Sequence, residues 1–189
     1  MKSGGLAKPA HPAIVTAMMR VAKDLPFEDR RDFEDAARGL IAEAPRQITN
    51  TLGRAVWDTQ AFEFVTEHET SPDTVHPSLW RQAQLNRIAG LFYVCERVYQ
   101  VRGMDLSNMT IIEGDTGVII IDPVTSVETA QAAIELYRQH RGARDVRAVI
   151  YTHSHPDHYG GVKGAISTDD VTAGHVQVIA PDGFIEAIE

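Results

Sequence analysis

A series of short, β-branched segments separated by turn residues fills the second half of this chain, and no other feature restricts the fold as much. Three such segments follow Gly90, with the sequences FYVCERVYQVRG, NMTIIEG and GVIIIDP. The Gly, Asp and Asn residues between them predict consecutive antiparallel strands, with EGDTG as a hairpin turn. The second half is therefore predicted to form a sheet.

One helix and two more strands are expected to complete this sheet. The helical segment is SVETAQAAIELYRQHRG, with Ser126 as its candidate N-cap and Gly142 directly after its end. VRAVIYT is predicted as a buried strand and HVQVIAP as a later one. A helix laid over a sheet in the order β-β-β-α-β predicts a mixed α/β fold.

The first half of the chain has the pattern of amphipathic helices. Apolar residues at helical spacing run from Phe33 to Ala44, and Pro45 is expected to end that helix. A second helix is predicted to begin after Ser78, its candidate N-cap, and to end near Gly90. We therefore expect two parts, a helical extension over residues 1–90 and an α/β domain over residues 91–189.

Composition excludes several classes of function. The formal net charge of −8 disfavours nucleic acid or an anionic membrane as the main partner. Cys95 is the only cysteine, so an intrachain disulfide and a thiolate metal cluster are excluded, and we expect Cys95 to be a small buried residue. No signal peptide and no membrane span are predicted. This pattern favours the cytoplasm, whereas a missing leader would place the protein in the periplasm or outside the cell.

The stretch YTHSHPDHYGG, residues 151–161, places three of the eight histidines within six positions. It follows the predicted strand VRAVIYT, and side chains converge at such strand ends in layered α/β folds. His153 and His155 are expected to point the same way, since side chains alternate in extended backbone and Pro156 keeps His155 extended. Asp157 and His158 follow the bend. Imidazole and carboxylate are ligands for Zn²⁺, Mn²⁺ or Fe, which predicts a metal site.

The remaining histidines do not share this pattern. Polar or helical contexts predict surface positions for four of them, which are His11, His68, His76 and His140. His175 precedes an apolar strand, and its role stays open.

The motif THSHPDH resembles the HxHxDH signature of the metallo-β-lactamase superfamily, whose fold is an αββα sandwich with two metals at one edge. The segments that flank the motif are more specific, because together they resemble the zinc-dependent linear alkylsulfatases. These segments are DFEDAARGLIA, PDTVHPSLWRQAQLN, YQVRGMDLSNMTIIEGDTGVIIIDP and AIELYRQHRGARDVRAVIYTHSHPDHYGGVKG. The resemblance extends from about Pro26 onward. It implies a partial αββα sandwich preceded by an N-terminal helical extension.

Carried over by position, His153 and His155 would bind one zinc, and Asp157 and His158 a second. Asp122, at the end of GVIIID, would support the site from behind the ligands; its alternative reading is a strand-ending turn before Pro123. The resemblance implies hydrolysis of alkyl sulfates such as dodecyl sulfate by water that zinc activates, with no other catalytic residue. The sulfate-binding residues and the bond that breaks, C–O or S–O, stay open.

The chain is several times shorter than members of that family. They carry further zinc ligands downstream, two glutamates and a histidine, followed by a helical dimerisation region and a lipid-carrier-like domain. We therefore interpret the chain as the N-terminal portion of such an enzyme, whose complete form is expected to be a homodimer. Residues of ligand type near its end are Asp169, Asp170, His175 and Glu186. The alternatives are another hydrolase of the superfamily, such as a lactonase or thioesterase, and a non-catalytic metal-binding or interaction fragment.

Overall fold

The protein is described here by a computed structural model that covers residues 8–189, and its contacts divide the chain into two units. The first unit contains the described residues up to Ala36 together with Phe62–Arg87. The second contains Ala37–Ala61 and Ile88–Glu189. Each unit is described separately.

The first unit is built from short helices. They are α1 (Pro12–Asp24), most of α2 (Arg31–Ala37), α3 (Phe64–Glu67) and α4 (Pro77–Leu85), with the 3₁₀ turn η1 (Gln60–Phe62) at its boundary. The α4 helix begins at Pro77, two residues earlier than predicted, because the His76 imidazole and not Ser78 caps it. Nδ1 of His76 accepts a hydrogen bond from the Ser78 backbone N–H at 3.2 Å.

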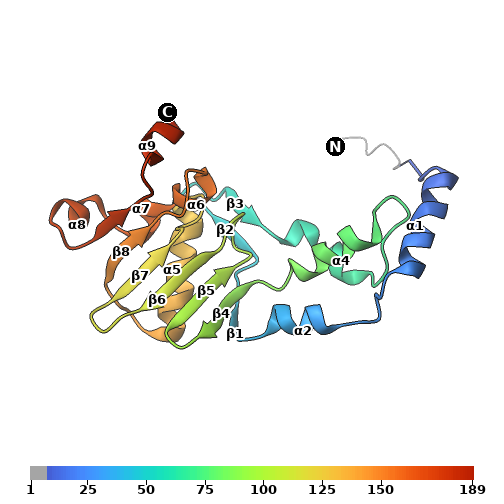
Figure 1. The fold of residues 1–189 in the computed structure, drawn as a ribbon, viewed down its shortest axis with the longest axis horizontal. Helices are drawn as coiled ribbons and strands as arrows, with labels where there is room; N and C mark the ends of the chain where they lie inside the picture. Colours follow the sequence, from blue (N-terminus) through green and yellow to red (C-terminus); the bar gives the residue numbers. More distant parts are fainter. Residues whose placement is uncertain (1–7) are drawn as a thin grey trace. The chain divides into compact units, whose positions relative to one another are not determined.

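A seven-stranded sheet forms the second unit (Figure 1). Its strands lie in the order β1 (Leu40–Glu43), β4 (Gly90–Cys95), β5 (Val98–Arg102), β6 (Met109–Glu113), β7 (Val118–Ile121), β8 (Val146–Ile150) and β9 (Gln177–Ile179). Neighbours are antiparallel from β1 to β7, whereas β7, β8 and β9 are parallel. A separate hairpin pairs β2 (Gln47–Thr49) with β3 (Ala55–Asp58). The predicted EGDTG turn is confirmed, since β6 and β7 pair and Gly114 N–H donates to Gly117 O at 2.7 Å.

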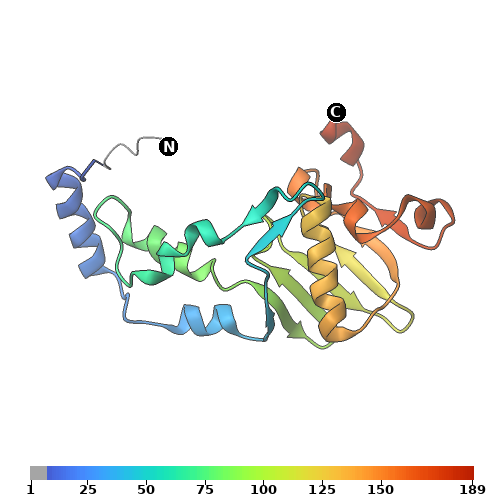
Figure 2. The ribbon, with the colours of Figure 1, turned by 180° about the vertical axis from the view of Figure 1, so that it is seen from behind.

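Helix α5 (Val127–Arg141) covers one face of this sheet (Figure 2). Its N-terminus has the predicted Ser126 cap, in a capping box with Thr129, and Gly142 follows its end with φ of 84°. The buried core between helix and sheet includes Tyr99, Val101, Met109, Ile111, Val118, Ile120, Val149, Ala130, Ala133, Ile134 and Tyr137. Short helices follow β8, and they are α6 (Pro156–Tyr159), α7 (Val162–Ala165), α8 (Thr168–Thr172) and α9 (Phe184–Ile188).

The opposite face of the sheet carries a second set of apolar residues. Ile112 pairs with Ile119, and Ile121 with Ile150, so these four side chains share that face, where each is only partly buried. One sheet with its helix layer is half of an αββα arrangement. The predicted fold class, a partial sandwich preceded by helices, is confirmed.

The prediction that the first helix continues to Ala44 is wrong. Helix α2 ends at Ala37, and residues 40–43 form β1, which pairs with β4. Gly39 marks the change: its φ is 76°, and an added Cβ would lie 2.2 Å from the Tyr93 carbonyl oxygen. Pairing along β4 thus overrides a helical pattern in the sequence.

Two further expectations need correction. The predicted boundary at residue 90 does not match the contacts, because residues 37–61 belong with the sheet. Cys95, expected to be buried, is exposed at the end of β4, where the strand turns into the hairpin to β5. The described residues include no helix that is both long and apolar enough to cross a membrane.

Candidate metal centre

The histidine-rich loop leaves the sheet at the edge where three strands end. Strand β5 is antiparallel to β6 and β6 to β7, so β5 runs in the same direction as β7 and β8. The connections after these three strands therefore meet at one edge. They are residues 103–108, 122–126 and 151–161, the last of which includes the short helix α6 (Figure 1).

The first donor pair is His153 and His155. Nε2 of His153 lies 3.1 Å from Nδ1 of His155, and the ring centroids are 4.7 Å apart. His155 keeps extended backbone, with φ of −75° and ψ of 135°, directly before Pro156. Two nitrogen ligands about 2.0–2.1 Å from one tetrahedral Zn²⁺ stand roughly 3.3 Å apart. The spacing of these nitrogens fits a shared ion.

The second donor pair is Asp157 and His158. Oδ2 of Asp157 lies 3.3 Å from Nε2 of His158, a separation that also fits two ligands of one ion. The two pairs are neighbours, since the His153 and His158 ring centroids are 4.0 Å apart. The structure thus brings together the four residues that the sequence motif indicated.

Asp122 lies directly behind His158. The residue is 7% exposed, and its carboxylate stands 2.8 Å from Nδ1 of His158. It also accepts hydrogen bonds from the Thr152 backbone N–H at 2.8 Å and the Thr152 hydroxyl at 2.7 Å. Asp122 has a φ of 55°, a left-handed conformation that costs energy for a residue with a side chain. Its many contacts hold it in that conformation.

Neither donor pair gains a third ligand within the described part of the chain. Between residues 8 and 189, no group of three or more His, Cys, Asp or Glu side chains is arranged to hold a metal ion. His175 instead lies 3.6 Å from Asp170, where both side chains are exposed. The four histidines predicted to be on the surface, His11, His68, His76 and His140, are all exposed.

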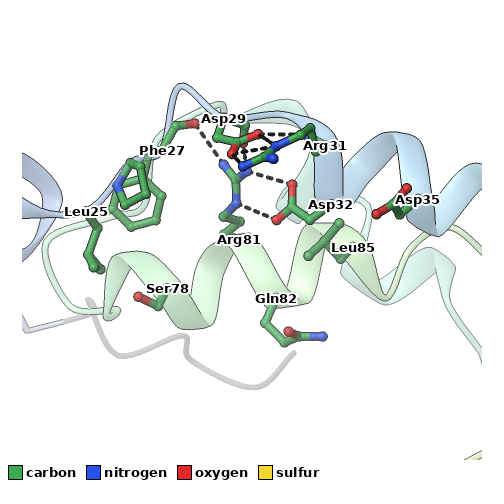
Figure 3. Close-up of a pocket in the computed structure, with 11 residues that line it drawn as sticks. Leu25, Phe27, Asp29, Arg31, Asp32, Asp35, Ser78, Arg81, Gln82 and Leu85 are labelled. Atoms are coloured by element: carbon green, nitrogen blue, oxygen red, sulfur yellow. Dashed lines mark hydrogen bonds and ion pairs between the residues drawn. The ribbon is translucent and has the colours of Figure 1, made fainter.

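A cavity also lies within the helical unit, beside a partly buried network of hydrogen bonds. A cavity of about 500 Å³ opens beside Arg81 of α4 (Figure 3). The Arg81 guanidinium donates to both Asp32 oxygens, at 2.8 and 2.7 Å, and to the carbonyls of Phe27 and Asp29. These hydrogen bonds hold the pKa of the Asp32 carboxyl below its usual value. Arg81 therefore ties α4 to α2 and to the segment before it.

Sequence reasoning missed two polar residues beside the metal-binding motif. Asp105 and Ser107 lie in the connection after β5, and each is 7% exposed. Ser107 donates its hydroxyl proton to the Asp157 carbonyl, and Asp105 accepts from Thr125 and Thr129. The available signal was a pair of polar residues in a short connection at the same sheet edge as the motif.

Comparisons with known proteins show what the chain is similar to. A sequence profile of the metallo-β-lactamase superfamily matches residues 102–187. The alkyl/aryl-sulfatase of Saccharomyces cerevisiae is 54% identical over 187 residues, which are 98% of this chain and 29% of that protein. A linear primary-alkylsulfatase of a Pseudomonas species is 51% identical over 181 residues, 95% of this chain and 27% of that protein.

A solved structure is similar over nearly the same range. The stereoselective inverting sec-alkylsulfatase of a Pseudomonas species superposes with a TM-score of 0.90 at 54% identity, over 96% of this chain and 28% of that one. The chain thus spans less than a third of the length of these relatives. Over nearly its whole length, the chain is similar to alkylsulfatases of the metallo-β-lactamase superfamily.

Proposed function

We propose that this chain carries the metal-binding motif of a zinc-dependent alkylsulfatase. In this proposal His153 and His155 hold one zinc, and Asp157 and His158 hold the second. The observation that carries it is the spacing within each pair, 3.1 Å between the two histidine nitrogens and 3.3 Å between Asp157 Oδ2 and His158 Nε2. Zn²⁺ at such a site is a Lewis acid that lowers the pKa of water from about 15.7 toward about 7.

The role of Asp122 in this proposal is to orient His158. A carboxylate that accepts the Nδ1 proton of an imidazole leaves Nε2 unprotonated and free to bind a metal. The 2.8 Å distance from Asp122 Oδ2 to His158 Nδ1 suits this bond. Thr152 holds the carboxylate in place through its N–H and its hydroxyl. The tautomer of His158 would then be set by the fold before any metal binds.

The proposed reaction is hydrolysis of an alkyl sulfate to an alcohol and inorganic sulfate. The named relatives divide into alkyl/aryl, linear primary and secondary alkylsulfatases, at 51–54% identity. We place the substrate of this protein among linear primary alkyl sulfates such as dodecyl sulfate, following the resemblance of its motif and flanking segments. Homodimerisation of the complete protein, which the same resemblance implies, belongs to this proposal.

The test is sulfate release by the purified chain with added zinc. We expect turnover of dodecyl sulfate to be faster than that of a secondary alkyl sulfate or an aryl sulfate, with Asp157→Ala as the background. The rate should be far below that of a longer relative, because catalytic zinc uses three protein ligands and each pair supplies two. Faster hydrolysis of a lactone or thioester than of any sulfate ester would replace the sulfatase proposal.

One observation favours a second candidate, a non-catalytic metal-binding module. Among the described residues neither pair is completed to three donors, and two donors can hold an ion without activating water in a fixed position. Zinc binding without release of sulfate above the Asp157→Ala background would favour this candidate.

A further inference from the structure

The connection after β5, residues 103–108, has two buried polar side chains whose partners lie in other connections at the same edge. Asp105 and Ser107 are each 7% exposed, although one carries a charge and the other a hydroxyl. Burial of such groups is costly unless each hydrogen-bonds to a partner. The partners therefore show what this connection is built to hold.

Asp105 ties the connection to the start of α5. Its carboxylate accepts hydrogen bonds from the Leu106 N–H at 2.6 Å, the Thr125 N–H at 3.2 Å and the Thr125 hydroxyl at 2.5 Å. The Thr129 hydroxyl in the first turn of α5 donates to the same carboxylate. Because one carboxylate receives all four donors, residues 103–108 and 122–126 form one hydrogen-bonded unit.

Ser107 connects this unit to the metal-binding motif. Its hydroxyl donates to the carbonyl oxygen of Asp157. In a longer helix that carbonyl would accept from the N–H of Gly161, four residues on, but α6 has only four residues and Gly161 N–H donates to Val124 O at 2.8 Å. The Ser107 hydroxyl thus takes the place of the missing helical hydrogen bond.

Glycines let the motif lie against the same unit from its other end. A Cβ added to Gly160 would stand 2.4 Å from Thr125 O, and one added to Gly161 would stand 2.3 Å from Pro123 O. Such close approach leaves room only for glycine. Residues 122–126 are therefore held between Asp105 on one side and the end of the motif on the other.

We propose that Ser107, supported by Asp105, is a positioning residue for the second metal-binding pair. It fixes the backbone at Asp157 and so sets the direction of the Asp157 carboxylate relative to the His158 imidazole. His153 and His155 precede α6, and the recorded side-chain hydrogen bond of Ser107 goes to Asp157 and to neither of them. This inference rests on the proposed metal-binding role of the two pairs.

The test is a titration of the purified chain with cobalt, followed by visible absorption. The cobalt ion whose binding is lost in Asp157→Ala is the equivalent that belongs to the second pair. Removal of groups that orient ligands lowers metal affinity by about 10–100-fold. We expect Ser107→Ala to weaken that equivalent about tenfold and the other less than about threefold. Asp105→Asn, which keeps the shape of the side chain, should change the same equivalent in the same direction. Ser107→Thr, which keeps the hydroxyl, should restore affinity.

Ser167→Ala is the matched control, because it removes the hydroxyl that caps α8 and lies outside the motif. It should leave both equivalents unchanged. Equal weakening of both equivalents by Ser107→Ala, or no weakening, would overturn the positioning role. Loss of the folded state in both Ser107→Ala and Asp105→Asn, seen by circular dichroism, would also overturn it, since the role would then be structural. Absence of cobalt binding by the unsubstituted chain would instead refute the metal-binding proposal itself, and the positioning role with it.

Discussion

A buried carboxylate lies at each end of α5, and the two carboxylates accept hydrogen bonds from different kinds of donor. At the N-terminal end Asp105 receives neutral donors, which are amide N–H groups and threonine hydroxyls. At the C-terminal end Glu113 receives the Tyr137 hydroxyl at 2.8 Å and two N–H groups of Arg141 at 3.0 and 3.1 Å. Both carboxylates are 7% exposed.

The helix dipole explains this difference. A negative charge is favourable near the N-terminus of a helix and unfavourable near its C-terminus, by about 0.3–1 kcal/mol at exposed positions. Asp105, at the N-terminal end, therefore needs no cationic partner. Glu113 lies at the C-terminal end, where its charge is unfavourable unless nearby arginines offset it. Arg141 supplies that charge, and Arg144 stands 3.8 Å from the same carboxylate. The recorded partners of Asp105, at the metal-binding edge, are thus all uncharged, whereas those of Glu113, at the opposite edge, include two arginines.

The largest expected effect is a loss of bound zinc, which should follow substitution at the metal-binding edge but not substitution at Glu113. We expect His153→Ala/His155→Ala to lose most of the zinc that purified protein carries, because it removes both nitrogens of the first pair. Glu113→Gln, at the other end of the sheet, should keep the zinc content of the unsubstituted protein. Elemental analysis of the three proteins measures this. Equal zinc in the double variant and the unsubstituted protein would show that the metal lies elsewhere.

A smaller effect concerns stability at the C-terminal end. Glu113→Gln should lower the free energy of unfolding by about 2 kcal/mol, since hydrogen bonds to a charged group contribute about 1.5–3 kcal/mol and Arg141 is partly solvated. Urea denaturation at neutral pH measures it. Asp115→Asn is the control, because Asp115 forms an ion pair with Arg97 whose side chains are 85% and 57% exposed. A loss as small as that of the control would mean that the buried cluster contributes no more than a surface pair.

The smallest effect is the pH dependence of that stability difference. Burial raises the pKa of Glu113, but hydrogen bonds from Arg141 and Tyr137 lower it more, so the folded value lies below the ordinary value of 4.5. The contribution of Glu113 is therefore fully present above about pH 4.5 and is lost as the pH falls through the folded value. The gap between the unsubstituted protein and Glu113→Gln should narrow as the pH falls below about 4.5. A constant gap over that range would contradict the assigned direction of the shift.

Sequence patterns predicted the elements from β6 to β8 well and those of residues 31–58 poorly. Strands β6 to β8 and helix α5 carry clear periodicity, turn residues and caps, which act over a few residues. The single segment predicted at FYVCERVYQVRG instead forms two paired strands, β4 and β5. The stripe from Phe33 to Ala44 has helical spacing too, yet residues 40–43 pair with β4, about fifty residues away. Pairing at that distance leaves no mark in a local pattern, and the β2–β3 hairpin was missed in the same way.

The amino-acid sequence by itself determined the composition of the candidate site. Four ligand-type residues within six positions, next to a buried strand and a glycine pair, are set by local spacing, since alternation and a proline fix how neighbouring side chains point. Tertiary structure alone decided what surrounds them. Asp122 reaches His158 and Ser107 reaches Asp157 across 36 and 50 residues of sequence, because parallel strands end at one edge of a sheet. Contacts of that separation depend on strand order and register, which only the folded chain defines.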